Sequence, residues 1–302
     1  MNELKKNIIS MYNDEGQQWL DSLPDITAKI ANEHNLSGLT PVNNMTFNYV
    51  ASGYQNDKPI ILKMGMNSKA LVKEVLCLKA FALASAAEVI AHDNNMIIMQ
   101  RAVPGFTLKN HFPDNDMDAT KILCEKLKEL YKASIPESHN LYHLSELFKT
   151  LDQKLDIPDE ILSKAKHLRD KLLSTTTEEV LLHGDLHFDN ILKNGDSESR
   201  RSSKSEDGWL VIDPKGFIGD PAFEPAAFLC NPIPAVLQEN KPRELIENRI
   251  NICSADLGID AQRITDWLYA KSVLCWAWSL EDNLDASYWK ELLSILYIIV
   301  YQ

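Results

Sequence analysis

Two short polar segments, each preceded by a run of apolar residues, constrain this chain more than any other feature. The first is His-Gly-Asp-Leu-His-Phe-Asp-Asn at residues 183–190. The second is Val-Ile-Asp-Pro-Lys-Gly at residues 211–216. Short apolar runs bounded by polar turns are typical of buried strands. The sequence therefore predicts two buried strands that carry acidic side chains at their ends.

The spacing of three residues in these segments indicates their chemistry. Asp185 and Asn190 form an H-x-D-x-x-x-x-N loop, and Asp213 ends the strand that follows it. Kinase-type folds transfer a phosphoryl group with this arrangement, in which the loop Asp accepts the proton of the acceptor hydroxyl. Mg²⁺ prefers hard oxygen ligands and keeps several waters, so Asn190 and Asp213 suffice to hold it on ATP. We predict Asp185 as the catalytic residue, Asn190 and Asp213 as metal ligands, and ATP and Mg²⁺ as cofactors.

Further residues are expected to bind the nucleotide. Lys63 lies inside the apolar run of residues 60–64, where an ammonium group suits the α- and β-phosphates. Glu74, in the next predicted helix, is its expected ion-pair partner. Backbone groups at Gln100 and Ala102 are expected to pair with the adenine edge. The chain contains neither G-x-G-x-x-G nor a P-loop, which excludes a Walker-type NTPase.

The order of predicted elements indicates an α+β, two-lobed, protein-kinase-like fold. Residues 1–102 are predicted to form a small nucleotide-binding lobe with an antiparallel sheet plus helix. Residues 103–302 are predicted to form a larger, mainly helical lobe for catalysis and substrate binding. In the small lobe, periodicity predicts strands and helices over short ranges: strands at 39–47, 49–53, 59–64 and 96–99, and helices at 13–34, interrupted near Pro24, and at 68–85.

In the large lobe, helices are predicted over residues 120–131 and 158–173, and others are predicted to begin at Pro221, Pro242 and Ala261. Apolar residues at helical spacing carry these predictions.

One polar segment of low complexity separates the two acidic segments. Residues 194–208 are rich in Ser, Asp, Glu, Lys and Arg. Such a composition predicts an exposed, flexible hairpin loop. We expect this insertion to leave the chemistry unchanged.

The spacing after Asp213 indicates a small acceptor. Asp220 and Pro221, which read as a helix N-cap and first helical residue, follow only seven positions later. This leaves no room for the long segment with which a protein kinase docks a peptide. The acceptor is therefore predicted to be a small molecule.

Four residues are candidates for holding that acceptor. Trp278, Glu281 and Asp282 stand at i, i+3 and i+4, so they share one helix face, which can hold a guanidinium or ammonium group. Glu224 is a further acidic candidate. The alternative is a capped helix end with solvated acids.

The roles of Lys215, His183 and His187 are structural or have two interpretations. Lys215 can contact the transferring phosphoryl group or pair with a nearby carboxylate. His183 is expected to be buried and hydrogen-bonded. A zinc-type cluster of His183, Asp185 and His187 is the alternative, but zinc sites need three or four closed ligands and this cluster would leave Asn190 and Asp213 without a role.

Charge and cysteine content restrict the partners and the compartment. The net charge of −12 argues against nucleic acid or an anionic membrane and suits a cationic small molecule, although it also serves solubility. Five scattered cysteines without C-x-x-C spacing are typical of reduced thiols in a cytoplasmic protein. No signal peptide, membrane span or obligate protein partner is evident.

These segments together resemble a known family, the aminoglycoside phosphotransferases, and within it the subgroup of streptomycin and hydroxyurea kinases. The similar segments extend over nearly the whole chain: residues 19–24, 61–63, 183–190, 209–224 and 277–282. The resemblance implies a kinase-like fold and ATP-dependent O-phosphorylation. It also implies Asp185 as the catalytic Asp, Asn190 and Asp213 as metal ligands, and Lys63 as the phosphate lysine.

The predicted function is transfer of the γ-phosphoryl group of ATP to a hydroxyl of an aminocyclitol antibiotic such as streptomycin, which would confer resistance. Two alternatives remain. The acceptor can be an unrelated metabolite, such as a sugar, an amino alcohol or a hydroxyurea-like compound. The protein can also be a catalytically silent nucleotide-binding module, against which the intact set of site residues argues.

Overall fold

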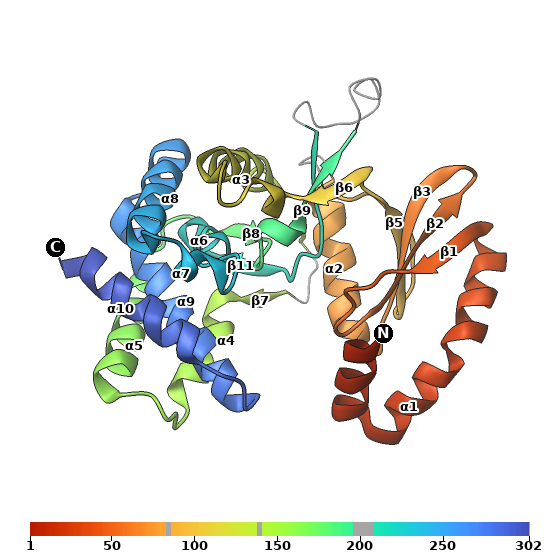
Figure 1. Cartoon of the computed structure of the whole chain (residues 1–302), viewed down its shortest axis with the longest axis horizontal. Helices are drawn as coiled ribbons and strands as arrows, with labels where there is room; N and C mark the ends of the chain where they lie inside the picture. Colours follow the sequence, from red (N-terminus) through yellow and green to blue (C-terminus); the bar gives the residue numbers. More distant parts are fainter. Residues whose placement is uncertain (83–85, 138–140, 196–207, 302) are drawn as a thin grey trace.

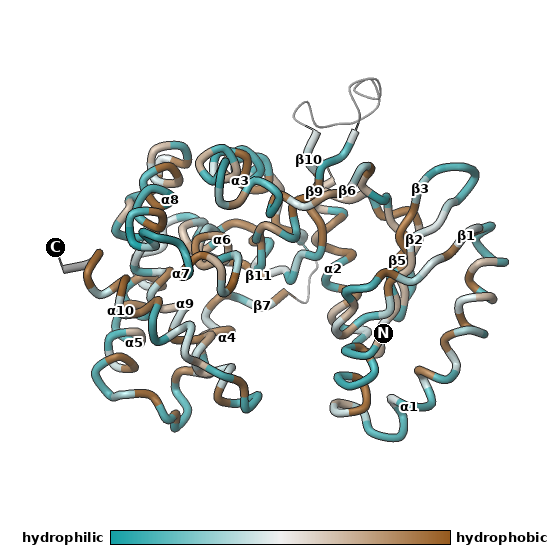
Figure 2. The backbone as a smooth tube through the Cα atoms, viewed as in Figure 1, coloured by the Kyte–Doolittle hydropathy of each residue, from teal (hydrophilic) through white to brown (hydrophobic). Residues whose placement is uncertain are grey.

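A five-stranded antiparallel sheet forms the core of the N-terminal part in the computed structural model (Figure 1). The structure describes residues 1–82, 86–137, 141–195 and 208–301. The strands follow the order β1-β2-β3-β5-β4: β1 Leu36–Pro41, β2 Tyr49–Gln55, β3 Lys58–Met64, β4 Val89–His92 and β5 Met96–Gln100. The central strands β3 and β5 carry most of the buried apolar residues of the sheet, and Figure 2 shows hydrophobic segments among the strands of this part.

The turn between β2 and β3 fixes the register of the strand that carries Lys63. Asn56 and Asp57 have φ angles of 47° and 63°. A two-residue hairpin whose central residues are both left-handed matches the twist of the flanking strands. Val50 therefore pairs with Lys63, and Lys63 pairs with Ile97 on the other side.

Two helices belong to this part, α1 Asn2–Glu33 and α2 Ser68–Ala80. The predicted interruption of α1 near Pro24 is wrong, because the helix continues through Pro24 and bends at Asn13, where φ is 50°. Buried Leu20, Leu23 and Ile30 hold the helix on both sides of Pro24, and this burial offsets the hydrogen bond that proline removes. Figure 1 shows the two arms of α1 on either side of the bend.

The remainder of the chain is mainly helical, with α9 at its centre. Most of α9 Ala261–Glu281 is buried, including every residue from Ile264 to Leu274. The larger helices are α3 Asp116–Leu130, α5 Asp159–Ser174, α8 Pro242–Leu257 and α10 Ser287–Tyr301, and the shorter ones are α4 Leu144–Leu147, α6 Ala226–Leu229 and α7 Ala235–Gln238.

Two small sheets carry the acidic segments. One has the order β10-β9-β6 and the other β7-β11-β8. Their strands are β6 Pro104–Thr107, β7 Tyr142–His143, β8 Val180–Leu182, β9 Ile191–Asn194, β10 Trp209–Val211 and β11 Phe217–Gly219. The first acidic segment thus lies between β8 and β9, and the second between β10 and β11.

The predicted fold class, an antiparallel-sheet lobe followed by a mainly helical part, is confirmed. Several element boundaries differ from the prediction. The first strand begins at Leu36 and ends at Pro41, β4 was not predicted, and α2 ends at Ala80. The helix predicted from Pro221 is a single 3-10 turn that ends at Phe223.

The predicted insertion loop falls largely on residues 196–207, which lie outside the described residues. At its base, β9 and β10 pair as an antiparallel hairpin, and the Asn194 amide donates to the Gly208 carbonyl at 2.8 Å. Among the described residues, no helix combines the length and apolarity needed to cross a membrane.

Candidate active site

His183 joins the two acidic segments to each other. Its Nε2 contacts the Ile212 carbonyl at 2.8 Å, and its own carbonyl accepts from the Lys215 amide at 2.7 Å. The side chain is fully buried, and burial lowers the pKa of His183 to about 4. The imidazole is therefore neutral at physiological pH and holds the two segments together, as predicted for a structural histidine.

The loop that follows presents Asp185 at its surface. Gly184 has a φ of +83°, and a Cβ there would lie 2.5 Å from the ring of Phe217, so this position requires glycine. The side-chain amide of Asn190 donates to the Asp185 carbonyl at 2.8 Å. The side chain of Asp185 is 37% exposed, and one of its oxygens lies 3.9 Å from His187 Nε2. The backbone of this loop is fixed while the Asp185 carboxylate stays open to a ligand.

Asp213 lies between two lysines. Lys63 Nζ contacts Asp213 Oδ1 at 2.7 Å, and Lys215 Nζ contacts Oδ2 at 2.7 Å. Lys63 also pairs with Glu74 at 2.6 Å, in agreement with the predicted ion pair. Burial works against the charged forms, but the neighbouring charges raise the pKa of Lys63 and lower that of Asp213 well below its usual range. The structure thus brings Lys63, Glu74 and Asp213 together from β3, α2 and the β10–β11 segment.

The oxygen atoms of Asp213 and Asn190 are suitable ligands for a hard cation. The Asn190 amide nitrogen is engaged with the Asp185 carbonyl, which leaves the amide oxygen to accept. The Ile212 amide donates to the Asn190 carbonyl at 3.1 Å, so backbone hydrogen bonding holds Asn190 close to Asp213. One amide oxygen and one carboxylate suit Mg²⁺. Within the residues that the structure describes, no three His, Cys, Asp or Glu side chains are grouped to hold a metal ion, so the alternative zinc-type cluster does not form there.

The buried carboxyl of Glu224 binds the backbone of the loop that carries Asp185. Its Oε1 accepts from the Gly184 amide at 2.9 Å, and the residue is only 2% exposed. Its Oε2 is buried without a hydrogen-bond partner among the described residues. Burial raises the pKa of Glu224 to about 7, although the backbone of Gly184 and the ammonium of Lys271 favour the charged form. The carboxyl therefore changes its charge near neutral pH.

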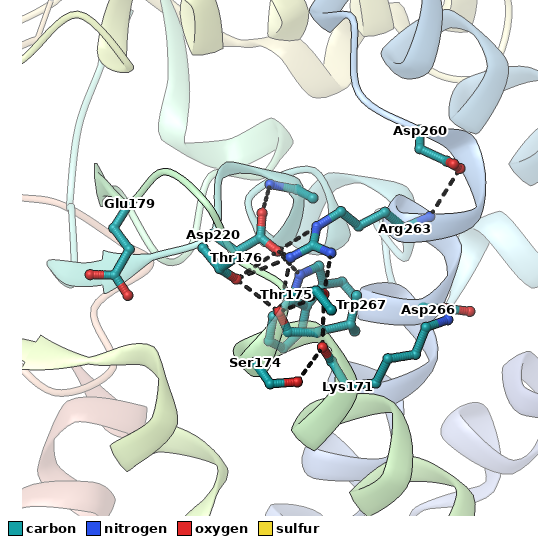
Figure 3. A network of polar contacts seen from close by, with 12 residues as sticks. Lys171, Ser174, Thr175, Thr176, Glu179, Asp220, Asp260, Arg263, Asp266 and Trp267 are labelled. Carbon is teal, nitrogen blue, oxygen red and sulfur yellow. Dashed lines mark hydrogen bonds and ion pairs between the residues drawn. The ribbon is translucent and has the colours of Figure 1, made fainter.

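Asp220 anchors the segment that carries Glu224 to α9. Figure 3 shows its carboxylate at the centre of a polar network. It caps the 3-10 turn by accepting from the Ala222 amide at 2.9 Å, as predicted for an N-cap. It also accepts from Trp267 Nε1 at 2.7 Å and from Arg263 Nε at 2.8 Å. These contacts to two successive turns of α9 fix the position of the segment that carries Glu224.

The connection predicted to bind adenine follows β5. The Gln100 amide donates to the Glu88 carbonyl at 2.8 Å, and the Arg101 amide donates to the Pro59 carbonyl at 3.2 Å. Among the described residues, the amide of Ala102 has no such acceptor. The backbone donor that remains for a base in this connection is therefore that of Ala102.

The residues predicted on α9 lie at its C-terminal end. Trp278 is half-buried against the main core, whereas Glu281 and Asp282 are exposed. Asp282 is the residue after the helix, and its amide donates to the Trp278 carbonyl at 3.0 Å. The described hydrogen bonds and ion pairs do not connect these three side chains with Asp185.

Sequence reasoning missed Lys271, which lies on the same face of α9 as Cys275 and Trp278. It is 9% exposed, with Nζ 5.1 Å from the ring of Phe223. Burial raises the pKa of the Cys275 thiol to about 12. Phe223 precedes Glu224, whose carboxyl binds the Gly184 amide, so this face lies near the loop that carries Asp185. The available signal was a lone cation within an apolar helical run.

The titration of Glu224 gives a testable pH dependence. The folded protein holds this proton up to about pH 7, whereas an ordinary glutamate releases it near 4.5. The free energy of unfolding should therefore lose roughly 3 kcal/mol from this group as the pH rises through that range. His183 works in the opposite direction, because its lowered pKa costs stability as the pH falls from 6.5 to about 4.

The contribution of Glu224 to the pH dependence of stability is isolated by comparing the native protein with Glu224→Gln. Urea unfolding between pH 5 and pH 8 should show that the variant gains stability relative to the native protein as the pH rises. A difference that stays constant with pH would contradict the assigned titration.

Comparison with known protein families gives a match over most of the chain. A family model described as aminoglycoside/hydroxyurea antibiotic resistance kinase matches residues 54–283. The matched range contains Lys63, Asp185, Asn190 and Asp213.

Individual relatives agree with this match. The chain is 30% identical to a streptomycin 3''-kinase from Klebsiella pneumoniae over 203 residues, which cover 66% of this chain and 71% of that protein. It is 22% identical to a streptomycin 6-kinase from Streptomyces griseus, over 90% of this chain and 88% of that protein. A solved aminoglycoside phosphotransferase with ADP and hygromycin B superposes with a TM-score of 0.64 at 14% identity, over 89% of this chain and 97% of that chain. This likeness confirms the predicted two-lobed, kinase-like fold.

Proposed function

Because this chain belongs to the aminoglycoside/hydroxyurea antibiotic resistance kinase family and is a small-molecule phosphotransferase, we propose that it transfers the γ-phosphoryl group of ATP to a hydroxyl of an aminoglycoside such as streptomycin. The observation that carries the proposal is the convergence of Lys63, Asp185, Asn190 and Asp213 at one place. Lys63 and Asp213 are in contact although 150 positions separate them.

In this proposal each residue of the cluster has one task. Asp185 accepts the proton of the acceptor hydroxyl and aligns its oxygen with the γ-phosphorus. Asn190 and Asp213 would hold Mg²⁺, which would supply positive charge against the negative charge of the ATP phosphates. Lys63, kept charged and oriented by Glu74, contacts the α- and β-phosphates.

The adenine is proposed to lie against the connection after β5. The free amide of Ala102 can donate to the base, and the neighbouring carbonyls, with that of Gln100, can accept from it. Residues 42–48, which join β1 to β2, would cover the phosphates. We also propose a cytoplasmic location, which the requirement for ATP and the five free thiols support.

The acceptor is proposed to occupy the side of Asp185 that faces α9. Trp278 offers an aromatic surface, and Glu281 and Asp282 offer negative charge beyond it for a guanidinium or ammonium group. Glu224, which binds the Gly184 amide next to Asp185, is proposed to contribute a further acidic group. The similarity to two streptomycin kinases that modify different positions supports the substrate class, and it leaves the choice of hydroxyl to experiment.

One observation favours the second candidate, a kinase of a less cationic metabolite. Lys271 is a buried lysine on the α9 face beside Phe223, and the neighbouring Glu224 binds the Gly184 amide directly before Asp185. A positive charge at that place disfavours an acceptor that carries several ammonium groups.

The experiment is ADP release from Mg·ATP with a panel of acceptors: streptomycin, other aminoglycosides, hydroxyurea, simple sugars and amino alcohols. Asp185→Asn serves as the blank. Strong turnover with streptomycin that is absent in the blank supports the antibiotic kinase. Turnover only with a sugar or an amino alcohol favours the metabolite kinase. Binding of Mg·ATP without turnover on any acceptor would refute the antibiotic proposal and favour a silent nucleotide-binding module.

A further inference from the structure

The backbone around Lys215 is fixed next to the catalytic loop. The amides of Lys215 and Gly216 both donate to the carbonyl of His183, at 2.7 Å and 3.2 Å. Gly216 has a φ of +72°, and a Cβ there would lie 2.4 Å from the sulfur of Cys77. No other residue type fits this turn without rearrangement. The start of the Lys215 side chain is therefore held two residues after Asp213 and next to His183, which begins the segment that carries Asp185.

The ammonium group of Lys215 contacts the Asp213 oxygen that Lys63 does not use. Both lysine–carboxylate distances are 2.7 Å, but the two lysines differ in their surroundings. The Lys63 side chain is 10% exposed and is also bound to Glu74, whereas that of Lys215 is 45% exposed. Asp213 is the ion-pair partner of Lys215 among the described residues. Lys63 is therefore fixed by two carboxylates, whereas Lys215 is more exposed and pairs with the half-buried Asp213 alone among the described residues.

The pair with Asp213 gives Lys215 little structural value. An ion pair between partly exposed groups contributes little to stability, because water screens it and both side chains lose freedom. Its position has a clear electrostatic value, however. A phosphoryl group in transfer spreads its negative charge over three equatorial oxygens, and a cation placed at those oxygens lowers the barrier. Lys215 is the more exposed of the two cations that contact the carboxylate proposed to hold the metal.

We propose that Lys215 is a catalytic residue whose ammonium group leaves Asp213 and contacts the transferring γ-phosphoryl group, an inference that rests on the proposed function. The bond between the γ-phosphorus and its bridging oxygen breaks, and its electron pair stays on ADP. The acceptor oxygen forms the new bond to phosphorus, and its proton passes to Asp185. Lys215 gives up no proton and forms no bond; it neutralises charge on the phosphoryl oxygens.

Steady-state kinetics of Lys215→Met give the first test. The turnover number is expected to fall about 10²–10³-fold with little change in the KM for ATP, because the contact is made in the transition state. Lys215→Arg should recover part of the loss, and Lys215→Gln should behave like Lys215→Met. Lys149→Met removes an ion pair of the same length, 2.7 Å to Glu146, and should keep native turnover.

Calorimetry gives a second readout that does not depend on turnover. Binding of Mg·ADP is measured with and without fluoroaluminate, which mimics the transferring phosphoryl group. Lys215→Met and Lys215→Gln should bind ADP normally and lose the extra affinity that fluoroaluminate confers on the native protein. Native turnover in these variants, or an equal loss of both affinities, would overturn the role of Lys215. A native protein that binds no ADP and phosphorylates no acceptor would refute the proposed function itself.

Discussion

Asp185→Asn is expected to lower the turnover number by roughly 10²–10⁴-fold while the protein keeps its affinity for Mg·ATP. The amide occupies the same space as the carboxylate but cannot accept the proton of the acceptor hydroxyl. The loop should survive the change, because Asn190 donates to the backbone carbonyl of Asp185 at 2.8 Å rather than to its side chain. Single-turnover phosphoryl transfer and calorimetric binding of nucleotide, measured on the same preparation, separate the two effects.

The matched control is Asp189→Asn in the same loop. The Asp189 side chain is exposed, and the loop is held at this position by the Asp189 backbone amide, which donates to His187 Nδ1 at 3.3 Å. This variant loses one negative charge close to the site, as Asp185→Asn does, and should keep native turnover. Equal turnover in the two variants would show that charge alone, and not proton acceptance by Asp185, matters here.

The parts of the site that follow local rules could be predicted from the sequence. The spacing of Asp185 and Asn190 fixes a loop in which one side chain binds the backbone of the other, and the structure contains that contact. The apolar run around Lys63 predicts a strand, and the Lys63–Glu74 pair forms. These features depend on neighbours in sequence or on one well-defined chemical arrangement, which is why patterns indicate them.

The features that sequence patterns missed depend on distant contacts. Pro24 was expected to interrupt α1, but helix packing overrides the proline, and the bend lies at Asn13. There, the amide-bearing side chain tolerates positive φ, and Gly16 allows the two arms to approach, since a Cβ at Gly16 would lie 2.6 Å from the Ile8 carbonyl. Lys271 was missed because a lone lysine in an apolar helical run does not show which residues it will contact, and its position beside Phe223 depends on the packing of α9.

Arg249→Met is expected to destabilise the protein by roughly 3–5 kcal/mol, because it leaves an uncompensated charge in the interior. The guanidinium is fully buried in α8 and binds Asp116 through two hydrogen bonds of 2.9 Å and 2.6 Å. It also donates to the carbonyls of Phe228, Leu229 and Asn231. Methionine fills part of the volume but satisfies none of these acceptors. For a chain of this size the melting temperature should fall by about 10 °C, which thermal unfolding measures directly.

The loss of stability in Arg249→Met should also affect the active site. The guanidinium carbon lies 5.1 Å from the ring of Phe188, and that ring stacks on Phe228 at 4.0 Å. Phe188 belongs to the loop between Asp185 and Asn190, so turnover should decline at a lower temperature in Arg249→Met than in the native protein.

The stability of Arg249→Lys should be intermediate, since the ammonium group of lysine cannot reproduce the planar guanidinium and its paired hydrogen bonds. Arg243→Met is the control on the same helix; its pair with Glu247 is 39% and 32% exposed and should contribute less than about 1 kcal/mol. Equal melting temperatures for Arg243→Met and Arg249→Met would mean that the buried pair joining α8 to α3 supports neither the fold nor the loop.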